Sequence, residues 1–424
     1  MTDPRFLGID VGTSGVRACL IDTQGRELGT AQTALPEPLR SNDSVEQDPE
    51  LWRQALVGTL DDLAGRCDLH RVTALALDAT SATVLACDAA GEPLGPALMY
   101  NDGRAVAEAA RIATVAAPGS AARGAHSGLA KALWLQKRYP VTARLLHQAD
   151  WLTGCLTGRF DSSDENNVLK LGYDPVARRW PDWLATLIPL ARLPQVLPPG
   201  TPIAPLRPDL ARRWALPQAQ VVAGTTDSTA AFLATGADRV GQAVTSLGST
   251  LVLKVLAAYP VSAPEYGVYS HRLGDRWLVG GASNSGGAVL RQYFDATRLH
   301  ALEARLDPEH PTGLDYYPLP GVGERFPLCD PGLRPRVGPR PADDARFLQG
   351  LLEGIAAIEH RGYRLLHTLG APYPAEVISV GGGAANVPWR QIRARYLEVP
   401  VTVAVHQDAA YGSACLAMRT AASC

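Results

Sequence analysis

The sequence contains very little lysine. Only four lysines occur in 424 residues, and none of them follows a glycine-rich loop as Gly-Lys-Ser or Gly-Lys-Thr. A P-loop nucleotide site needs such a lysine against the terminal phosphates, so this class of nucleotide-binding protein is excluded. Any phosphate group bound by this chain must therefore be held by backbone N–H groups, hydroxyls, arginines or a metal ion. The four lysines are Lys131, Lys137, Lys170 and Lys254.

Other features are absent as well. The seven cysteines form no Cys-x-x-Cys pair, and their odd number is typical of reduced thiols in a cytoplasm. The first residues, MTDPRFLGID, lack the basic stretch and long apolar run of a signal peptide, and no segment has the uncharged length that spans a bilayer. Because the formal net charge is only -2, nothing indicates a nucleic-acid or membrane partner. We therefore expect a cytoplasmic globular protein, a monomer or a homodimer.

The length and composition are those of a two-domain globular protein. A chain of 424 residues exceeds what one hydrophobic core usually serves, and 46% apolar with 19% charged residues is ordinary for a folded protein. Strand-like apolar runs alternate with helical periodicity, which predicts α/β architecture. A break at 236–241 separates an expected N-terminal domain, residues 1–237, from a C-terminal domain, residues 238–424. Helices are predicted at 49–63, 104–115, 131–138, 149–157 and 344–369.

The first chemical motif follows a short apolar run near the N-terminus. Residues 6–10 and 16–21 are predicted strands joined by the turn GTSG at 12–15. Glycines let a backbone approach an anion, exposed N–H groups and hydroxyls can cradle phosphate oxygens, and Asp10 can hold a hydrated Mg²⁺. An ordinary hairpin turn with a capping aspartate is an equally weighted alternative, because short glycine motifs often occur without such a role.

The second motif, GTTDS at 224–228, opens a helix of small residues. An aspartate just after a strand can accept the proton of a bound hydroxyl, and phosphoryl transfer asks little other covalent chemistry of a protein. Asp227 is therefore a candidate general base. The alternative is that Asp227 only caps the helix, which is the commonest use of aspartate there and would be preferred for this motif alone.

Three further polar turns are weak signals when taken singly. The segment SLGST at 246–250 is either a phosphate-binding turn or an ordinary hairpin. Three glycines at 381–383, after a predicted buried strand, allow a flat ring such as adenine to lie against the backbone, or form a flexible connection. The segment YNDGR at 100–104 can bind several hydroxyls, although surface turns of this composition are common.

Taken in order, these segments resemble the FGGY carbohydrate kinases from Phe6 to about Ala417. The series is GIDVGTSGVR, LDATSATV, MYNDGRA, ADWLTGCLTGRFDSSDENN, AGTTDSTAAFLATGA, SLGST, GGASNSGG, GVGERFPLCDP and SVGGGAANVPWRQIRA. The resemblance implies an α/β fold of two actin-like, ribonuclease H-like domains, with a small sugar, ATP and Mg²⁺ in a catalytic cleft between them. It is greatest to the short members regarded as D-ribulose kinases, which share a GTSG-x-R first turn and an Asp-x-Thr-Ser second turn.

The resemblance also implies roles for individual residues. Asp227 matches the general base, and Asp10, the second expected catalytic residue, lies near the metal ion and the sugar. Contacts to ATP are expected from Thr13, Ser14, Arg17, Gly248, Ser249, Thr250, Gly287, Arg291, Gly382, Gly383 and Asn386. Contacts to the sugar are expected from Asp10, Ser14, Asp78, Thr80, Ser81, Asp102, Arg104 and Asp227.

The sequence departs from the family pattern at particular turns. Gly-Ser-Thr at 248–250 stands where many relatives have Gly-Thr-Ser, and Ala79 stands where the ribulose-type pattern usually has glycine. Xylulose kinases resemble one another in carrying Gln-Met-His where this chain has Thr80 and Ser81. The chain is also shorter than most members of the family.

The main hypothesis is transfer of the γ-phosphoryl group of Mg·ATP to a hydroxyl of a ketopentose, with D-ribulose as the first substrate. D-xylulose or another polyol is the alternative substrate. A non-catalytic sugar- or nucleotide-binding regulatory protein on the same fold is the alternative of another class, and a phosphatase is a third. Asp10, Asp227 and the two phosphate turns argue against a regulatory protein, because a protein that only binds needs no base.

Overall fold

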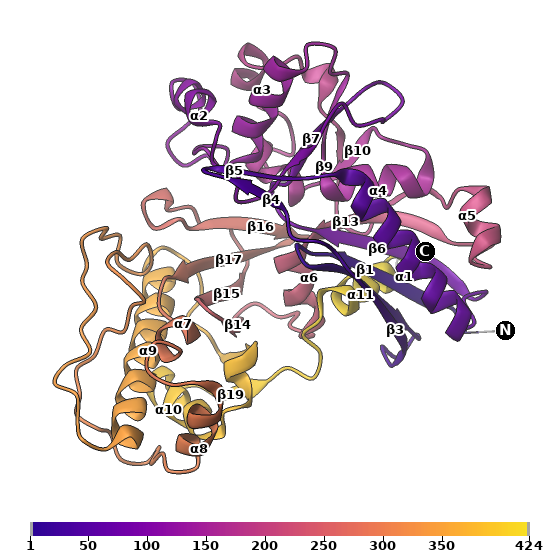
Figure 1. Ribbon diagram of the computed structural model, residues 1–424. Helices are drawn as coiled ribbons and strands as arrows, with labels where there is room; N and C mark the ends of the chain where they lie inside the picture. Colours follow the sequence, from indigo (N-terminus) through magenta and orange to yellow (C-terminus); the bar gives the residue numbers. More distant parts are fainter. Residues whose placement is uncertain (1–2, 422–424) are drawn as a thin grey trace. The chain divides into compact units, whose positions relative to one another are not determined.

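The computed structural model describes residues 3–421 and divides them into two compact units. Unit 1 comprises residues 3–234 and 406–421, and unit 2 comprises residues 235–405. Each unit is built around its own six-stranded sheet, with helices packed against it (Figure 1).

The central sheet of unit 1 consists of β1 (Arg5–Val11), β2 (Gly15–Ile21), β3 (Glu27–Ala34), β6 (Val72–Ala79), β12 (Pro202–Pro205) and β13 (Gln220–Thr226). Their order is β12-β13-β6-β1-β2-β3. Strands β1, β2 and β3 are antiparallel neighbours, whereas β6 pairs parallel with β1 and β13 pairs parallel with β6. The carboxyl ends of β1, β6 and β13 therefore meet at one edge of the sheet.

Four helices pack against this sheet: α1 (Pro49–Arg66), α4 (Gln148–Thr157), α6 (Asp227–Ala234) and α11 (Ala409–Ala421). Helix α11 lies directly on β1 and α6, because glycines remove side chains from both contacts. A Cβ atom on Gly8 of β1 would lie 1.9 Å from the carbonyl oxygen of Ala410. A Cβ atom on Gly412 would lie 1.8 Å from the carbonyl oxygen of Ala230. The backbones therefore approach to a distance that no side chain at these positions would allow.

A second, smaller sheet in unit 1 consists of β4 (Leu39–Ser41), β5 (Ser44–Gln47), β7 (Val84–Cys87), β8 (Ala97–Leu98) and β9 (Arg144–His147). It packs with α3 (Gly128–Arg138), and α3 contacts α2 (Val106–Ala113). The short strands β10 (Ser162–Asp164) and β11 (Gln195–Leu197) form a parallel pair, and α5 (Pro208–Arg213) precedes β13. Strand β6 of the central sheet leads through a short turn into β7, so the two sheets of unit 1 are joined at the carboxyl end of β6.

The sheet of unit 2 consists of β14 (Gln242–Leu247), β15 (Leu251–Ala257), β16 (Tyr269–Leu273), β17 (Arg276–Ser283), β18 (Glu376–Val380) and β19 (Val401–Val403). Their order is β16-β17-β15-β14-β18-β19. Strands β14, β15 and β17 are antiparallel neighbours, and β18 and β19 continue parallel to β14. This arrangement repeats that of β1, β2, β3, β6 and β13 in unit 1, so both units have the strand pattern of a ribonuclease H-like, actin-like domain.

The helices of unit 2 are α7 (Gly287–Leu290), α8 (Ala296–Glu303), α9 (Asp344–Thr368) and α10 (Val387–Leu397). Helix α9 packs on β15 and β17 and against α10. A fully buried ion pair joins α10 to α9: Arg393 donates to both oxygens of Glu359, at 2.6 and 2.7 Å. Thr245 of β14 donates to the same carboxylate at 2.6 Å. Because the pair is fully hydrogen-bonded, it fixes the register of two helices and a strand.

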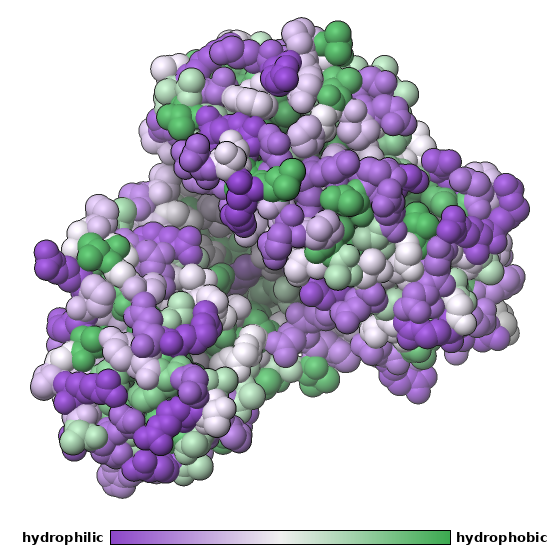
Figure 2. Space-filling model, viewed as in Figure 1, coloured by the Kyte–Doolittle hydropathy of each residue, from purple (hydrophilic) through white to green (hydrophobic). Residues whose placement is uncertain are grey.

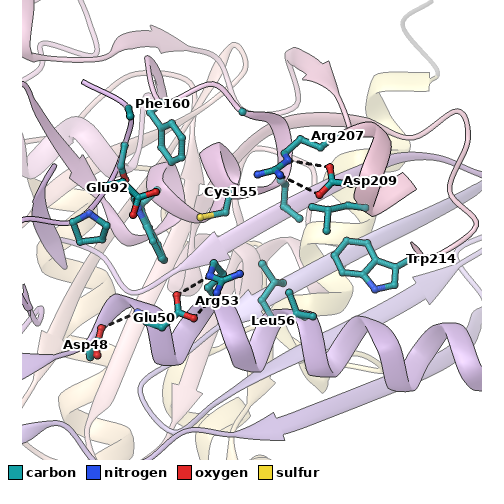
Figure 3. Close-up of a pocket in the computed structure, with 18 residues that line it drawn as sticks. Asp48, Glu50, Arg53, Leu56, Glu92, Cys155, Phe160, Arg207, Asp209 and Trp214 are labelled. Carbon is teal, nitrogen blue, oxygen red and sulfur yellow. Dashed lines mark hydrogen bonds and ion pairs between the residues drawn. The ribbon is translucent and has the colours of Figure 1, made fainter. Parts of the chain in front are cut away.

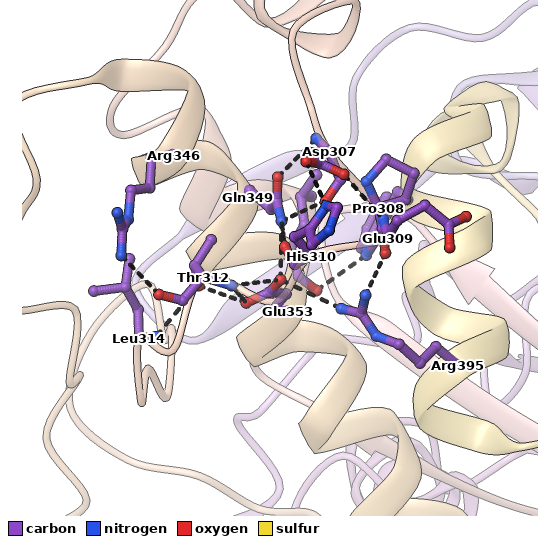
Figure 4. A network of polar contacts seen from close by, with 12 residues as sticks. Asp307, Pro308, Glu309, His310, Thr312, Leu314, Arg346, Gln349, Glu353 and Arg395 are labelled. Atoms are coloured by element: carbon purple, nitrogen blue, oxygen red, sulfur yellow. Dashed lines mark hydrogen bonds and ion pairs between the residues drawn. The ribbon is translucent and has the colours of Figure 1, made fainter.

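The long connection between α8 and α9 is anchored by a polar network around Glu353 of α9 (Figure 4). Glu353 accepts hydrogen bonds from the backbone N–H and the hydroxyl of Thr312 and from the Gln349 side chain. Gln349 also donates to the backbone carbonyls of Asp307 and His310, both at 2.8 Å. A segment without regular secondary structure is thereby held to the helix.

The predicted secondary structure is largely confirmed. The hairpin of β1 and β2, the helices α1, α3, α4 and α9, and the strand β18 occur where the sequence pattern indicates them, with ends shifted by a few residues. The boundary between units lies after residue 234, three residues before the predicted one. The predicted C-terminal domain, 238–424, differs at its end, because the described residues from His406 belong to unit 1. The physical reason is the packing of α11 on β1, β6 and α6.

No helix within residues 3–421 combines the length and the apolar character needed to cross a bilayer. On the face shown in Figure 2, hydrophobic residues at the surface occur in small separate groups between hydrophilic ones.

Candidate active site

Three aspartates lie at the carboxyl ends of neighbouring parallel strands in unit 1. Asp10 of β1 is directly opposite Asp78 of β6 in the parallel register. Asp227 follows β13 as the first residue of α6, and Thr225 of β13 pairs with Asp78. The carboxylates are near enough that Asp10 and Asp227 both raise the pKa of Asp78. Three acids from residues far apart in the sequence thus form one cluster.

Within this cluster, Asp78 and Asp10 differ in the groups around them. Asp78 is fully buried, and burial, with the neighbouring Asp10 charge, raises its pKa well above the ordinary value. Burial also raises the pKa of Asp10, although the nearby Asp78 and Arg17 oppose that shift. Arg17 donates to Asp10 Oδ2 at 3.0 Å, and Ser413 donates to Asp78 Oδ2 at 2.5 Å. The arginine therefore favours the charged form of Asp10, whereas Asp78 has only a neutral donor beside it.

Asp227 is placed differently from the other two acids. It is partly exposed, whereas Asp10 and Asp78 are buried. Its Oδ1 accepts a hydrogen bond from the backbone N–H of Ser228 at 2.6 Å. The start of α6 fixes the backbone, and the carboxylate stays accessible to a small molecule. This position is that of a general base as well as that of a helix-terminal aspartate.

The turn at 12–15 has the geometry of a tight hairpin loop. Gly12 N–H donates to the Gly15 carbonyl at 3.0 Å, and the turn joins β1 to β2. Thr13 is partly exposed and Ser14 is exposed, so both hydroxyls are available to a ligand. Arg17 follows on β2 and faces Asp10 in the antiparallel register. The turn thus presents the Thr13 and Ser14 hydroxyls at the surface, close in sequence to the guanidinium of Arg17.

The structure corrects the predicted role of Thr80. This residue is only 4% exposed, and its hydroxyl already bonds to Gln148 Oε1 at 2.7 Å and to Thr83 Oγ1 at 2.6 Å. Because the hydroxyl hydrogen is used inside the protein and the side chain is nearly buried, Thr80 has little left to offer a sugar. Ser81, the next residue, is partly exposed and is the better placed of the two.

The structure also corrects the predicted role of Asp102. Asp102 is fully buried, and its carboxylate accepts hydrogen bonds from the Val45 N–H at 2.7 Å and from the Arg104 side chain at 2.7 Å. Arg104 bonds in addition to Glu46, 2.5 Å away, and lies 4.9 Å from the Trp134 ring centroid. Asp102 thus makes its hydrogen bonds inside the protein, and Arg104 is partly exposed, so of these two predicted residues Arg104 is the one that a ligand can reach.

Lys131 of α3 is fully buried and forms hydrogen bonds with the backbone at the start of the same turn. Its ammonium donates to the carbonyl oxygens of Met99 at 2.8 Å and Tyr100 at 3.3 Å. Burial lowers the pKa of Lys131 to about 7, although the nearby Asp102 opposes the shift. The unfolded chain keeps the ordinary lysine value of 10.5 and therefore binds more protons than the folded chain between the two values. The contribution of Lys131 to the free energy of unfolding therefore rises as the pH increases above about 7.

We expect the difference in unfolding free energy between wild type and Lys131→Met to grow by about 1 kcal/mol from pH 6 to pH 8. Only the wild type releases the buried proton in this interval, so the wild type gains relative to the variant. Urea unfolding at several pH values measures the effect. Lys137→Met, on the exposed side of the same helix, is the matched control and should give a constant difference. A constant difference for Lys131→Met would mean that the lysine titrates outside this range.

In unit 2, most of the predicted nucleotide residues line one pocket of about 500 Å³. Its apolar walls come from Leu247, Leu290, Phe294, Leu299 and Trp389, which suit a flat aromatic ring. Its polar lining includes the predicted residues Gly248, Ser249, Gly287, Arg291, Gly382, Gly383 and Asn386. Thr250, also predicted, is not part of this lining.

The β14–β15 turn and the start of α7 meet at this pocket. Arg291 donates to the Ser249 hydroxyl at 2.8 Å, and the Gly287 N–H donates to the Gly248 carbonyl at 2.9 Å. A Cβ atom on Gly287 would lie 2.8 Å from that carbonyl oxygen, so only glycine permits the approach. The hydrogen bond to Ser249 places the Arg291 guanidinium at the turn 248–250, which contains two hydroxyls and no lysine.

The glycine-rich segment after β18 closes the other side of the pocket. Gly381 has φ of +85°, which favours glycine, and a Cβ atom on Gly383 would lie 2.4 Å from the Trp389 ring. Asn386 is the N-cap of α10 and accepts from the Trp389 N–H at 2.8 Å. The three glycines are therefore an ordered turn between a strand and a helix, and the alternative of a flexible connection is not what the structure shows.

Unit 1 contains a second cavity, of about 660 Å³, between α1, α4 and α5 (Figure 3). Two arginines point into it, and each is paired with a carboxylate nearby in the sequence: Arg53 with Glu50, both on α1, and Arg207, just before α5, with Asp209. None of the residues predicted for sugar or ATP lines this cavity.

Residues that the sequence did not indicate complete the site. Ser413 of α11 bonds to Asp78, Lys131 supports the turn of Arg104, and Gln148 of α4 bonds to Thr80. Ser413 lies more than 300 positions after Asp78, so no local pattern relates them. Gln148 precedes the segment ADWLTG, and its position just before a predicted helix is the one signal available.

Comparisons with known proteins agree with this arrangement. The model of the N-terminal domain of the FGGY family of carbohydrate kinases matches residues 5–234, and that of the C-terminal domain matches residues 243–421. The chain is 30% identical to the xylulose kinase of Escherichia coli K12, over 92% of this chain and 84% of that protein. It is 27% identical to the L-fuculokinase of Salmonella typhi, over 95% and 89% of the two chains.

The fold is also that of solved sugar kinases. The crystal structure of a xyloylose kinase from Brucella ovis superimposes with a TM-score of 0.90 at 27% identity, and covers 99% of this chain and 91% of that chain. Both halves of the sequence and both ribonuclease H-like sheets therefore match one family. The chain belongs to the FGGY family of carbohydrate kinases.

Proposed function

We propose that this carbohydrate kinase transfers the γ-phosphoryl group of ATP to a hydroxyl of a 2-ketopentose, with D-xylulose as the preferred sugar. The observation that supports the proposal most is the accessible carboxylate of Asp227 beside the buried pair of Asp10 and Asp78. Such a cluster offers both a base for a sugar hydroxyl and a carboxylate for a hydrated cation.

The chain's own residues provide the proton transfer and the orientation. Asp227 accepts the proton of the sugar hydroxyl while that oxygen forms its bond to the γ-phosphorus. The bond from the γ-phosphorus to the β–γ bridging oxygen breaks, and ADP leaves with that electron pair. The exposed or partly exposed hydroxyls of Thr13 and Ser14, with Arg17, are proposed to orient phosphate oxygens, and the pocket of unit 2 is proposed to hold the adenine ring.

The donor set fits Mg²⁺ rather than a metal that needs many protein ligands. Within the described residues no group of three or more histidines, cysteines or acids could hold a metal ion. Mg²⁺ takes one or two carboxylates and keeps water and phosphate oxygens as its other ligands, and Asp10 is the proposed carboxylate. When bound, the ion would neutralise charge on the β- and γ-phosphate oxygens.

D-xylulose replaces D-ribulose as the first candidate for two reasons. Relatives found by sequence and by structure carry the name xylulose kinase, including the protein with 30% identity. The argument for D-ribulose also depended on the Thr80 hydroxyl, which is bonded to Gln148 and Thr83. A regulatory sugar-binding protein on the same fold is the alternative of another class, and it would bind sugar without forming ADP.

A coupled ADP-release assay over D-xylulose, D-ribulose, L-fuculose, gluconate and glycerol tests the proposal. We expect D-xylulose to give the highest kcat/KM, about tenfold or more above glycerol, because a pocket that pairs substrate hydroxyls discriminates sharply against ligands that lack them. A higher kcat/KM for D-ribulose would reverse the substrate assignment and keep the kinase. Calorimetric sugar binding with no ADP from any sugar would favour the regulatory protein.

A further inference from the structure

We infer that Gln148 is a positioning residue for the sugar: it fixes the turn 80–83, here called the sugar turn, so that Ser81 contacts a substrate hydroxyl. The inference rests on the proposed function and deepens it, because it names the device that sets sugar preference. Gln148 is fully buried and acts through the turn rather than by touching the substrate.

Gln148 holds the sugar turn at both ends. Its side-chain oxygen accepts from the Thr80 N–H at 3.3 Å and from the Thr80 hydroxyl at 2.7 Å. Its own backbone N–H donates to the Thr83 carbonyl at 3.1 Å. The hydroxyls of Thr80 and Thr83 bond to each other at 2.6 Å. One residue at the start of α4 thereby clamps the first and the last residue of the turn.

The clamped turn has an unfavourable backbone conformation at its third residue. Ala82 has φ of +67° although it is not glycine, and it is fully buried. A left-handed conformation at such a residue is unfavourable and persists only where the surroundings enforce it. The bonds from Gln148 and the weak turn bond from the Thr83 N–H to the Thr80 carbonyl, at 3.4 Å, are the contacts that enforce it.

Only one end of the Gln148 amide is used by the protein. Among the described residues the Gln148 side-chain nitrogen has no hydrogen-bond partner, although it is buried. The side-chain oxygen, in contrast, is the acceptor for the buried Thr80 N–H and hydroxyl, and its loss would leave those donors unsatisfied. The effect of Gln148 on the turn is therefore due to its oxygen.

The sugar turn lies where it can act on the proposed reaction. It begins two residues after Asp78, at the edge of the sheet that carries Asp10 and Asp227. Ser81, at its tip, is partly exposed, whereas Thr80, Ala82 and Thr83 are buried. Of the four residues in the turn, Ser81 is therefore the one whose hydroxyl a bound ketose can reach.

The test compares Gln148→Leu, Ser81→Ala and the double variant for D-xylulose, D-ribulose and ATP. We expect Gln148→Leu to lower kcat/KM for the preferred sugar about 10- to 100-fold through KM, since small misplacements of a positioning group have effects of this size. The KM for ATP should stay within about twofold. The double variant should lose little beyond either single variant, because both remove the same contact.

Two further variants keep the test decisive. Gln148→Glu retains an oxygen that accepts from Thr80 and should keep the wild-type order of sugars. Thr73→Val removes another buried hydroxyl without a described partner, at the opposite end of β6, and should change no kinetic constant. Where Gln148→Leu fails to fold, Thr83→Val, which removes the bond to Thr80, carries the same comparison.

The outcomes separate this inference from the proposed function. A wild type that forms no ADP with any sugar overturns the proposed function and the inference together. An active wild type with unchanged sugar KM values in Gln148→Leu, or with additive losses in the double variant, overturns the inference alone.

Discussion

Asp227→Ala is expected to lower kcat by roughly 10²–10⁴-fold while the protein stays folded and still binds sugar and ATP, because that range is what a general base typically contributes. Asp227→Asn should lose nearly as much, since the amide keeps the shape of the side chain but accepts a proton poorly. Single-turnover kinetics with calorimetric binding of each substrate separate the loss of proton transfer from a loss of affinity.

An aspartate whose role is established by geometry gives the control. Asp343 caps α9 and accepts from the Ala345 N–H at 3.2 Å. Loss of such a cap costs about 0.5–2 kcal/mol, so Asp343→Ala should lower the melting temperature and leave kcat per folded molecule unchanged. If Asp227→Ala behaves like Asp343→Ala, then Asp227 is a helix-terminal residue and the proposed mechanism must be abandoned.

Removal of divalent cations is expected to abolish sugar-dependent ADP formation. None of the four lysines belongs to a predicted phosphate turn, so the charge of the phosphates has few protein cations to meet it. Arg17 is bonded to Asp10 and Arg291 to Ser249, and a metal ion must supply the remaining positive charge. The assay is run after chelation and then titrated with MgCl2, which should restore full activity.

A variant distinguishes a metal effect at Asp10 from a general effect on ATP. Asp10→Asn should need a much higher Mg²⁺ concentration for half-maximal activity, whereas wild type saturates once ATP is complexed. Calorimetry of sugar alone, with and without the chelator, shows whether the apo protein keeps its sugar site. Undiminished turnover in metal-free buffer would rule out the proposed role of the cation.

The parts of the structure that the sequence predicts well are those with local causes. The hairpin of β1 and β2 is set by two apolar runs and a glycine-rich turn, and α9 by a long amphipathic pattern with an aspartate cap. Asp10 and Asp78 each follow an apolar run directly, and Asp227 follows a third such run after the short segment Gly-Thr-Thr. The three aspartates lie close together because β1, β6 and β13 are parallel, so that their carboxyl ends lie at the same edge of the sheet.

The parts that the sequence does not predict have causes distant in the chain. Thr80 was expected to face the sugar, but a glutamine 68 positions later bonds its hydroxyl. Asp102 was expected to bind sugar, but Val45 and Arg104 occupy its oxygens. Whether a polar side chain faces a ligand or a buried partner depends on these long-range contacts, which hydrophobic periodicity does not encode.

The return of α11 to unit 1 has a consequence for the order in which the protein is made. Gly8 of β1 is synthesised before any residue of unit 2, whereas Ala410, which it touches, is synthesised after all of them. Unit 2 lies wholly between the two parts of unit 1 in the chain, so all of unit 2 is synthesised before helix α11. Domains usually fold as they emerge, the N-terminal one first. Here unit 1 begins before unit 2 and is completed after it, and the surface of β1 and β6 that α11 covers stays uncovered until α11 has been synthesised.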